Sequence, residues 1–188
     1  MASPEFSLSR WARPVGLSLM IGAWAVLGGL ASPAHASGDA LVEGERAYAH
    51  KEYAHAALYL RRAAENGSPV AQTYLGYMYQ MGRGVPQDYA AAAGWFQLAA
   101  EQGEPEAQFL LGLLFDKGFG VPVDWVTAEV WLILAASHAD EKDRVYWASV
   151  RDGIAQKLTL DQLHEAQRRA FTSVPVARFG APPLSARF

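Results

Sequence analysis

The feature that most constrains the fold of this chain is an internal repeat of 36 residues. The segment AQTYLGYMYQMGRGVPQDYAAAAGWFQLAAEQG, from Ala71, aligns without a gap on AQFLLGLLFDKGFGVPVDWVTAEVWLILAASHA, from Ala107. The coinciding positions are Gly76 with Gly112, Gly82 with Gly118, Gly84 with Gly120, Asp88 with Asp124, Ala92 with Ala128, and Trp95 with Trp131. A weaker third unit precedes these two, with Tyr53, Ala56 and Gly67 in register. A period of this length indicates a stack of similar supersecondary units.

The spacing of apolar residues predicts that each unit is a pair of α-helices. Almost no stretch of the chain shows the alternation that is typical of a β-strand. We therefore expect an all-α, right-handed solenoid of helical hairpins with capping helices at its C-terminal end. The expected helices cover residues 40–50, 53–66, 69–81, 88–102, 105–117, 124–139, 141–157 and 160–172.

The stretch GRGVPQDY, which begins at Gly82, raises the question of a phosphate-binding loop. Such a loop follows a strand and continues into Lys-Ser/Thr or into a third glycine. Here the preceding segment has helical spacing, and Gln87 stands where the third glycine would be. We interpret the stretch as a turn, in which Gly82 and Gly84 adopt positive φ and Asp88 caps the next helix. Trp95 is expected to fill the space between successive pairs, as is Trp131 in the second copy.

The N-terminal residues 1–36 have the pattern of a cleavable signal peptide. Arg10 and Arg13 precede the uncharged apolar run Val15–Leu30, and small residues follow at Ala34 and Ala36. We expect cleavage after Ala36, a periplasmic or secreted location, and no integral membrane span after cleavage. A retained membrane anchor is the alternative, although this run of 16 residues is shorter than the roughly 20 residues that a span needs.

After this segment, the chain is expected to divide into a repeat region, a capping helix pair and a tail. The repeat region covers residues 37–139, with units at 40–68, 69–104 and 105–140; the capping pair covers 141–172 and the tail 173–188. Thr159 and Gln162 form a capping box at the start of the last helix. The tail contains three prolines and no periodicity, so we expect it to be extended or disordered. Its apolar residues Phe179, Leu184 and Phe188 leave open that it packs against the helices or a partner.

The two strong units resemble the Sel1-like repeat, a relative of the tetratricopeptide repeat. The residues that carry the resemblance are Ala71, Leu75, Gly76, Tyr79, Gly82, Gly84, Val85, Asp88, Ala92, Trp95, Ala99 and Ala100. The second copy departs from this pattern only at Phe115, where the family has tyrosine, and the first unit is more similar to a plain tetratricopeptide repeat. The resemblance implies a non-enzymatic scaffold for protein–protein contacts. Exported bacterial members act in envelope signalling, exopolysaccharide control, motility or host interaction.

Composition argues against several other classes of function. With 16 Lys and Arg against 19 Asp and Glu, the chain lacks the basic excess typical of nucleic-acid binding. The absence of cysteine excludes disulfides and thiolate metal sites. His50 and His55 are five residues apart, whereas metal ligands on one helix prefer three or four. The acidic cluster Glu101, Glu104 and Glu106 suits a helix start. We therefore predict no catalytic residue, no metal and no cofactor.

The candidate binding surface is the concave face, which the first helix of each pair lines in this repeat class. The residues on those helices that do not belong to the repeat framework are Thr73, Tyr77, Gln80, Phe109, Leu113 and Asp116. Aromatic anchors with a polar rim suit a groove for a protein or peptide partner, although packing against the tail or a neighbouring helix is the alternative. Two other functions stay open: a glycan-binding protein using Tyr77 and Trp147, and an envelope hydrolase acting on peptidoglycan or β-lactams. We expect a monomeric adaptor.

Overall fold

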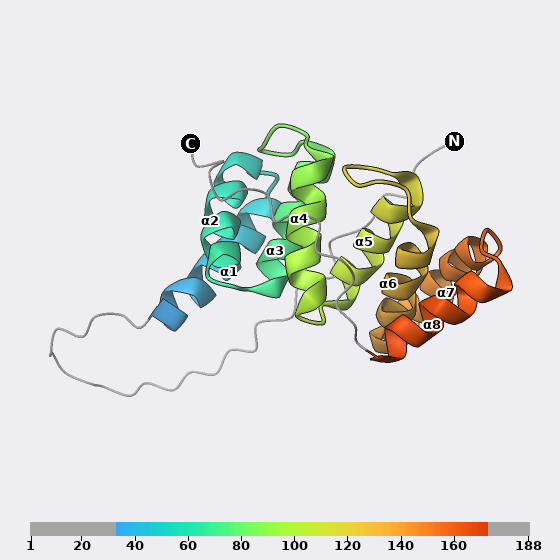
Figure 1. Ribbon diagram of the computed structural model, residues 1–188. Helices are drawn as coiled ribbons and strands as arrows, with labels where there is room; N and C mark the ends of the chain where they lie inside the picture. The colour runs from blue at the N-terminus through green and yellow to red at the C-terminus, as the bar shows by residue number, and fades with distance from the viewer. Residues whose placement is uncertain (1–32, 173–188) are drawn as a thin grey trace, which may run out of the picture.

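The computed structural model describes residues 33–172, which form eight helices and no strand (Figure 1). The helices are α1 (Pro33–Ala49), α2 (Tyr53–Glu65), α3 (Pro69–Met81), α4 (Tyr89–Glu101), α5 (Pro105–Lys117), α6 (Trp125–His138), α7 (Glu141–Ala155) and α8 (Leu160–Thr172). The pairs α1–α2, α3–α4 and α5–α6 make the most extensive contacts, and α2–α3 and α4–α5 join successive pairs. The all-α solenoid of helical hairpins is confirmed.

The N-terminal helix differs from its predicted extent. It begins at Pro33 rather than at Ala40, so it continues through the predicted cleavage site at Ala36. The remainder of the predicted signal peptide and the tail 173–188 lie outside the described residues. Across residues 33–172, every helix is too short or too polar to cross a membrane.

The first glycine loop is a turn, as predicted. Gly82 ends α3 with a φ of 66°, and Gly84 has a φ of 73°. The Asp88 carboxylate then caps α4 by accepting hydrogen bonds from the backbone N–H groups of Ala90 and Ala91, both at 2.9 Å. The loop therefore reverses the chain and supplies the cap of the next helix.

The second glycine loop repeats this geometry. Gly118 ends α5 with a φ of 71°, and Gly120 has a φ of 72°. The Asp124 carboxylate caps α6 by accepting a hydrogen bond from the Thr127 N–H at 3.0 Å. Gly118 is half-buried, and a Cβ atom on it would lie 2.8 Å from Val123 Cγ2, within the same loop. Gly118 therefore acts inside its own turn and not in the contact between successive pairs.

Small residues allow the two helices of a pair to approach closely. A Cβ atom on Gly76 would lie 2.7 Å from the Phe96 ring, and one on Gly112 would lie 2.9 Å from Leu132 Cγ. Both contacts cross from the first helix of a pair to the second. Glycine at this repeat position therefore permits close packing of the two helices of a pair.

The framework tryptophans differ in burial. Trp131 on α6 is 6% exposed and belongs to the hydrophobic core. Trp95 on α4 is only half-buried and packs against the edge of that core. The expectation of a tightly packed tryptophan therefore fits Trp131 better than Trp95.

The second glycine of each loop has a role that joins one pair to the next. A Cβ atom on Gly84 would lie 2.2 Å from the carbonyl oxygen of Tyr53, at the start of α2. A Cβ atom on Gly120 would lie 2.2 Å from the carbonyl carbon of Tyr89, at the start of α4. Each loop therefore lies directly against the backbone of the preceding pair, where only glycine fits.

The side chain beside this glycine extends the same contact. The Arg83 guanidinium lies 5.5 Å from the ring centroid of Tyr53, and the rings of Phe119 and Tyr89 are 4.9 Å apart. At the next unit, Lys157 Nζ lies 5.7 Å from the ring of Trp125, although no glycine loop is present there. The aromatic residues at the start of α2, α4 and α6 are 36 residues apart. The contact between the aromatic residue at the start of a second helix and the segment that follows the next first helix therefore recurs after α7.

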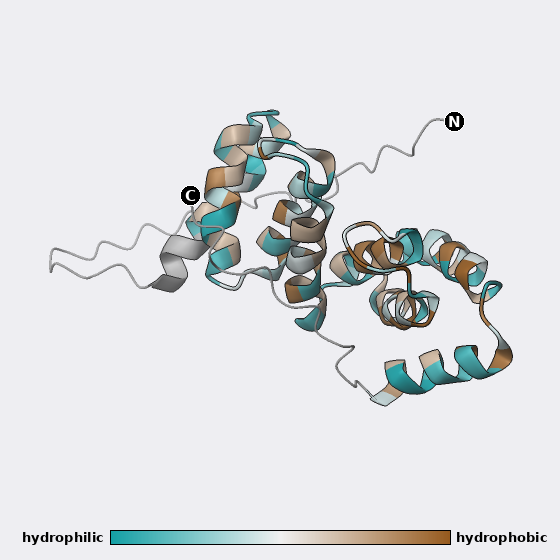
Figure 2. Cartoon of the chain, turned by 45° about the horizontal axis from the view of Figure 1, so that its top comes forward, coloured by the Kyte–Doolittle hydropathy of each residue, from teal (hydrophilic) through white to brown (hydrophobic). Residues whose placement is uncertain are grey.

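The C-terminal helices do not form a fourth hairpin. α7 and α8 both pack against α6, whereas they contact each other little. Figure 2 shows α8 standing apart from α7, with residues that are mostly hydrophilic. Only Ala166 and Ala170 of α8 are buried, and they pack with Val130 of α6. The predicted capping pair thus consists of two helices that cover α6 separately.

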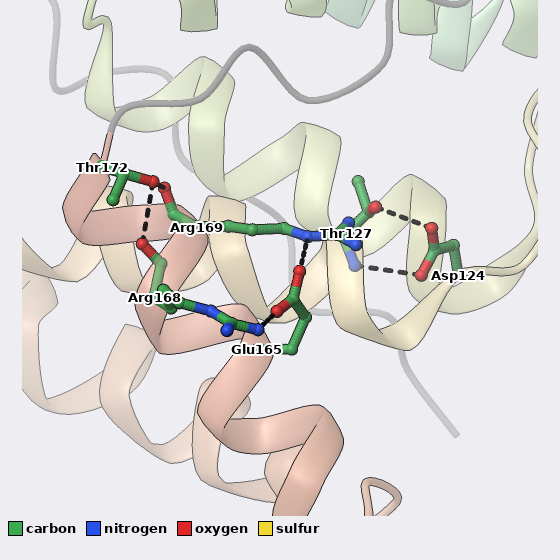
Figure 3. A network of polar contacts seen from close by, with 6 residues as sticks. All are labelled: Asp124, Thr127, Glu165, Arg168, Arg169 and Thr172. Atoms are coloured by element: carbon green, nitrogen blue, oxygen red, sulfur yellow. Dashed lines mark hydrogen bonds and ion pairs between the residues drawn. The ribbon is translucent and has the colours of Figure 1, made fainter.

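Local polar contacts stabilise α8 in place of a large apolar interface. Its predicted capping box is confirmed, since the Thr159 N–H donates to Gln162 Oε1 at 2.9 Å and the Gln162 N–H donates to Thr159 Oγ1 at 3.3 Å. The Glu165 carboxylate forms ion pairs with Arg168 and Arg169 one turn later, and Thr172 Oγ1 donates to the carbonyl of Arg168 (Figure 3). Such i,i+3 and i,i+4 pairs support a helix with little buried area.

Candidate functional site

The predicted groove residues lie on α3 and α5. We use the name A face for the side of α3 and α5 that carries these residues, together with the corresponding side of the first helices α1 and α7. Four of them are less exposed than expected. The exposed fractions are 3% for Thr73, 8% for Tyr77, 0% for Phe109 and 8% for Asp116. Gln80 and Leu113 are half-buried. These four side chains are therefore buried, contrary to the groove lining expected from the sequence, and a binding role for the six residues stays a prediction.

The helix α7 explains the burial of Phe109. The Phe109 ring stacks on Trp147 with centroids 4.9 Å apart and an interplanar angle of 10°, and Tyr146 lies 5.9 Å away. α7 begins 36 residues after α5, so it takes the place of a further first helix in the array. Trp147 is itself only 4% exposed and stacks on Phe109, so its ring is not open to a sugar in this structure.

Asp116 holds the far end of α7 rather than forming a polar rim. Its carboxylate forms ion pairs with Lys157, just after α7, and with Lys117, the latter at 2.9 Å. Burial by itself would raise the pKa of Asp116, but the hydrogen bonds from Lys157 and Lys117 outweigh it and lower the pKa below its ordinary value. Asp116 therefore stays ionised and fixes the segment after α7 to α5.

The N-terminal half of the A face holds a cluster of tyrosines around Arg83. The Arg83 guanidinium donates to Tyr48 Oη at 2.9 Å and lies 5.7 Å from the ring of Tyr77. The Tyr48 ring is 5.3 Å from Tyr53 and 5.4 Å from Tyr74. Burial raises the pKa of Tyr48 to about 12, although the hydrogen bond from Arg83 acts in the opposite direction. The phenol is therefore neutral at physiological pH.

Carboxylates flank this cluster on the neighbouring helices. Burial raises the pKa of Tyr74, and the nearby charges of Glu45 on α1 and Glu106 on α5 raise it further. An electrostatic effect of this kind requires both carboxylates to lie near the phenol. The A face therefore combines aromatic rings with acidic side chains that are half-buried.

The most open part of the A face lies on α7. Val145 is 79% exposed and Tyr146 is 43% exposed. Val145 follows Phe109 by 36 residues, so it occupies the predicted groove register on the next helix. Val145 is not among the residues predicted from the sequence, because α7 lacks the glycine loop that marks the other units. Its 36-residue spacing from Phe109 on α5 is the signal that identifies it.

The described structure allows a check of the histidines and acidic residues that were considered for chemistry. Across residues 33–172, no group of three or more His, Asp or Glu side chains is placed to hold a metal ion. His55 Nδ1 lies 3.4 Å from Glu52 Oε2, and Glu101 accepts a hydrogen bond from Gln97 at 3.0 Å. Glu104 belongs to the acidic cluster that also contains Glu101 and Glu106, and burial raises its pKa.

Glu129 on α6 is a buried carboxylate that the sequence analysis did not identify. Its side chain is 2% exposed, and its Oε2 atom makes no hydrogen bond. Alanines, Ala93 and Ala57, stand at the same repeat position in the preceding units. Burial raises the pKa of Glu129 from 4.5 to about 7, while Arg151 on α7 lowers it and Asp152 raises it. This buried acid lies within a repeat framework that otherwise uses a small apolar residue.

We predict that Glu129 makes folding stability depend on pH. Because its pKa is higher in the folded protein, the folded state binds an extra proton between pH 4.5 and about 7. Stability should therefore fall as pH rises through this range, by about 3 kcal/mol when complete. Urea unfolding at pH 5 and pH 8 should show this loss in the wild type and a much smaller one in Glu129→Gln. The exposed Glu65→Gln is the control, and an equal pH dependence in wild type and Glu129→Gln would refute the prediction.

Comparison with known proteins identifies the repeat. The family model of the Sel1 repeat matches residues 46–68, 69–104 and 105–140. The first of these matches lies in the unit that the sequence analysis compared with a plain tetratricopeptide repeat. No curated protein matches the chain significantly.

Two solved structures of bacterial proteins are similar to this chain. A protective antigen of uropathogenic Escherichia coli strains, described as displaying an SLR fold, aligns with a TM-score of 0.62 and 30% identity, over 76% of this chain and 30% of that one. A Sel1 repeat protein from Oxalobacter formigenes aligns with a TM-score of 0.46 and 44% identity, over 47% of this chain and 25% of that one. The chain thus spans less than a third of either protein. With its helical hairpins, glycine loops and three matched repeats, it belongs to the Sel1 repeat family.

Proposed function

We propose that this protein is a non-enzymatic adaptor of the bacterial cell envelope that binds a protein partner, in extended form, through its A face. Sel1 repeat proteins are typical protein-interaction scaffolds and are usually non-catalytic. Stacked helical pairs offer a continuous surface to which each unit contributes side chains. We propose that the adaptor acts in envelope signalling, exopolysaccharide control or motility.

The observation that carries the proposal is the exposure of two large apolar side chains, Val145 and Tyr146, on the α7 part of the A face. The Tyr146 ring lies 5.9 Å from the buried Phe109 ring on α5. Exposed apolar side chains next to a buried aromatic core are suited to anchoring a partner.

The register of α1 supports an envelope location. Gly44 faces Leu60 in the first pair as Gly76 faces Phe96 in the second. When Gly44 is aligned with Gly76, Ser37 aligns with Pro69, the first residue of α3. Cleavage after Ala36 would therefore remove one turn that the other repeats lack and would leave the repeat helix whole. N-terminal sequencing of the protein from an envelope fraction tests this, since a start at Ser37 is expected.

The adaptor role can be tested by affinity capture with the chain from Ser37 to Phe188. We expect this chain to retain one envelope protein and the variant Val145→Glu to lose it, because the charge falls on the open part of the A face. The matched control is Leu58→Glu, which alters a 67% exposed side chain on α2. Each variant is first compared with the wild type by circular dichroism.

The outcomes separate the proposed function from its alternatives. Capture by both variants would move the binding surface away from α7. Loss in both variants would indicate a nonspecific effect of charge. If the wild type retains glycan and no protein, the adaptor function is wrong.

A further inference from the structure

We propose that residues 173–188 of this chain dock on the A face as an extended intramolecular ligand, with Arg178–Phe179 at α5 and α7 and Arg187–Phe188 at α1 and α3. A partner that binds the A face would have to displace this segment. The docking itself needs no partner, so it can hold or fail independently of the adaptor function.

The charges of the two parts are complementary. Residues 173–188 contain two arginines and no acidic residue. Residues 37–172 contain 18 acidic and 12 basic residues, which gives a net charge of −6. Attraction between parts of one chain also acts at a high effective concentration, so weak contacts suffice to hold the segment.

The acidic groups lie where the proposal needs them. Glu45 on α1 and Glu106 on α5 lie close enough to Tyr74 to raise its pKa, and Tyr74 lies on α3 between them. Carboxylates are therefore present both at the α1–α3 part of the A face, from Glu45, and at its α5–α7 part, from Glu106. Arginine pairs well with such groups because its guanidinium can donate two hydrogen bonds to one carboxylate.

The segment also suits an aromatic surface. Its sequence, SVPVARFGAPPLSARF, contains the triplet Ala-Arg-Phe twice, at a spacing of nine residues, with prolines before and between the two copies. Proline favours the extended polyproline conformation, and extended proline-containing peptides bind grooves lined with aromatic side chains. Phe179, at the α5–α7 part, would then contact the half-exposed ring of Tyr146.

The length of the segment suits this placement. Sixteen residues can extend to about 53 Å from the end of α8 at Thr172. The two Ala-Arg-Phe triplets are nine residues apart and span about 28 Å in polyproline conformation, so the two arginines can contact carboxylates on different helices of the A face.

A spin label on the tail tests the docking in the full chain. The protein has no cysteine, so Ser185→Cys provides a single labelling site. We expect the label to broaden the amide NMR signals of A-face residues on α1 and α3, such as Glu45 and Thr73. Signals of Leu58 and Leu98, exposed on the second helices α2 and α4, should change at least fivefold less.

Charge substitutions test the specificity of the contact. Arg178→Glu combined with Arg187→Glu should abolish the broadening. Glu45→Arg should weaken it, and adding Arg187→Glu to Glu45→Arg should restore it by exchanging the two charges. No broadening in the wild type, or broadening that survives the double arginine substitution, would overturn the proposal. So would broadening in a mixture where the label and the isotope are on different molecules, because the tail would then bind a second copy.

Discussion

Replacing Gly120 by alanine is expected to lower the free energy of unfolding by about 3 kcal/mol or more. The residue has a φ of 72°, which an L-residue adopts only at a cost of roughly 1–2 kcal/mol. In addition, the new Cβ atom would lie 2.2 Å from the carbonyl carbon and oxygen of Tyr89. Backbone atoms cannot rotate away as a side chain can, so the loop would have to separate from α4. Urea unfolding followed by circular dichroism measures the loss.

A second glycine provides the matched control. Gly103 has a φ of 87°, but a Cβ atom there would have no neighbour within 4 Å. Gly103→Ala should therefore cost only about 1 kcal/mol, from backbone strain alone. The difference between the two variants isolates the contact between repeats. If Gly120→Ala costs no more than Gly103→Ala, that contact does not hold successive pairs together.

Replacing Phe109 by alanine is expected to lower the free energy of unfolding by about 3–5 kcal/mol, since its side chain is fully buried. The loss combines the burial of a large aromatic group with its stacking on Trp147. α7 should also loosen, because Phe109 is its main aromatic contact on α5. Urea unfolding gives the free energy, and the fluorescence of Trp147 in a chain whose other tryptophans are phenylalanine reports the loosening.

The neighbouring register position separates this structural role from a role in binding. Val145→Ala shortens a side chain that is 79% exposed and should change stability by less than about 0.5 kcal/mol. If Phe109→Ala lowers the free energy of unfolding as little as Val145→Ala does, then Phe109 is accessible and could line the groove predicted from the sequence. A large loss for Phe109→Ala alone would place Phe109 in the core.

The local structure of this protein could be predicted from its sequence because short-range chemistry sets it. Asp88 and Asp124 cap helices through backbone N–H groups two or three residues away. Gly82 and Gly118 each end a helix by adopting a positive φ. The repeat then shows that the same solution is used again 36 residues later, which fixes the pairing of helices and the family. These features depend on residues near in sequence or on an exact periodicity.

The environment of each side chain could not be predicted in the same way. An apolar residue such as Phe109 suits both an open groove and a helix interface, and its own helix does not tell which element covers it. Here α7 covers it, although α7 lacks the glycine loop that marks the other units. Asp116 likewise suits a polar rim, but Lys157, 41 residues away, pairs with it.

The packing of α8 and the burial of Glu129 have the same cause. The sequence predicts a helix over residues 160–172 from its cap and spacing, yet α8 packs against α6 and not against its neighbour in the chain. Glu129 is buried because α6 meets the last helices there, although its residue type favours solvent. The sequence by itself determined the helices, their turns and their repeat. Only the tertiary structure decided which faces meet, because burial depends on elements that are distant along the chain.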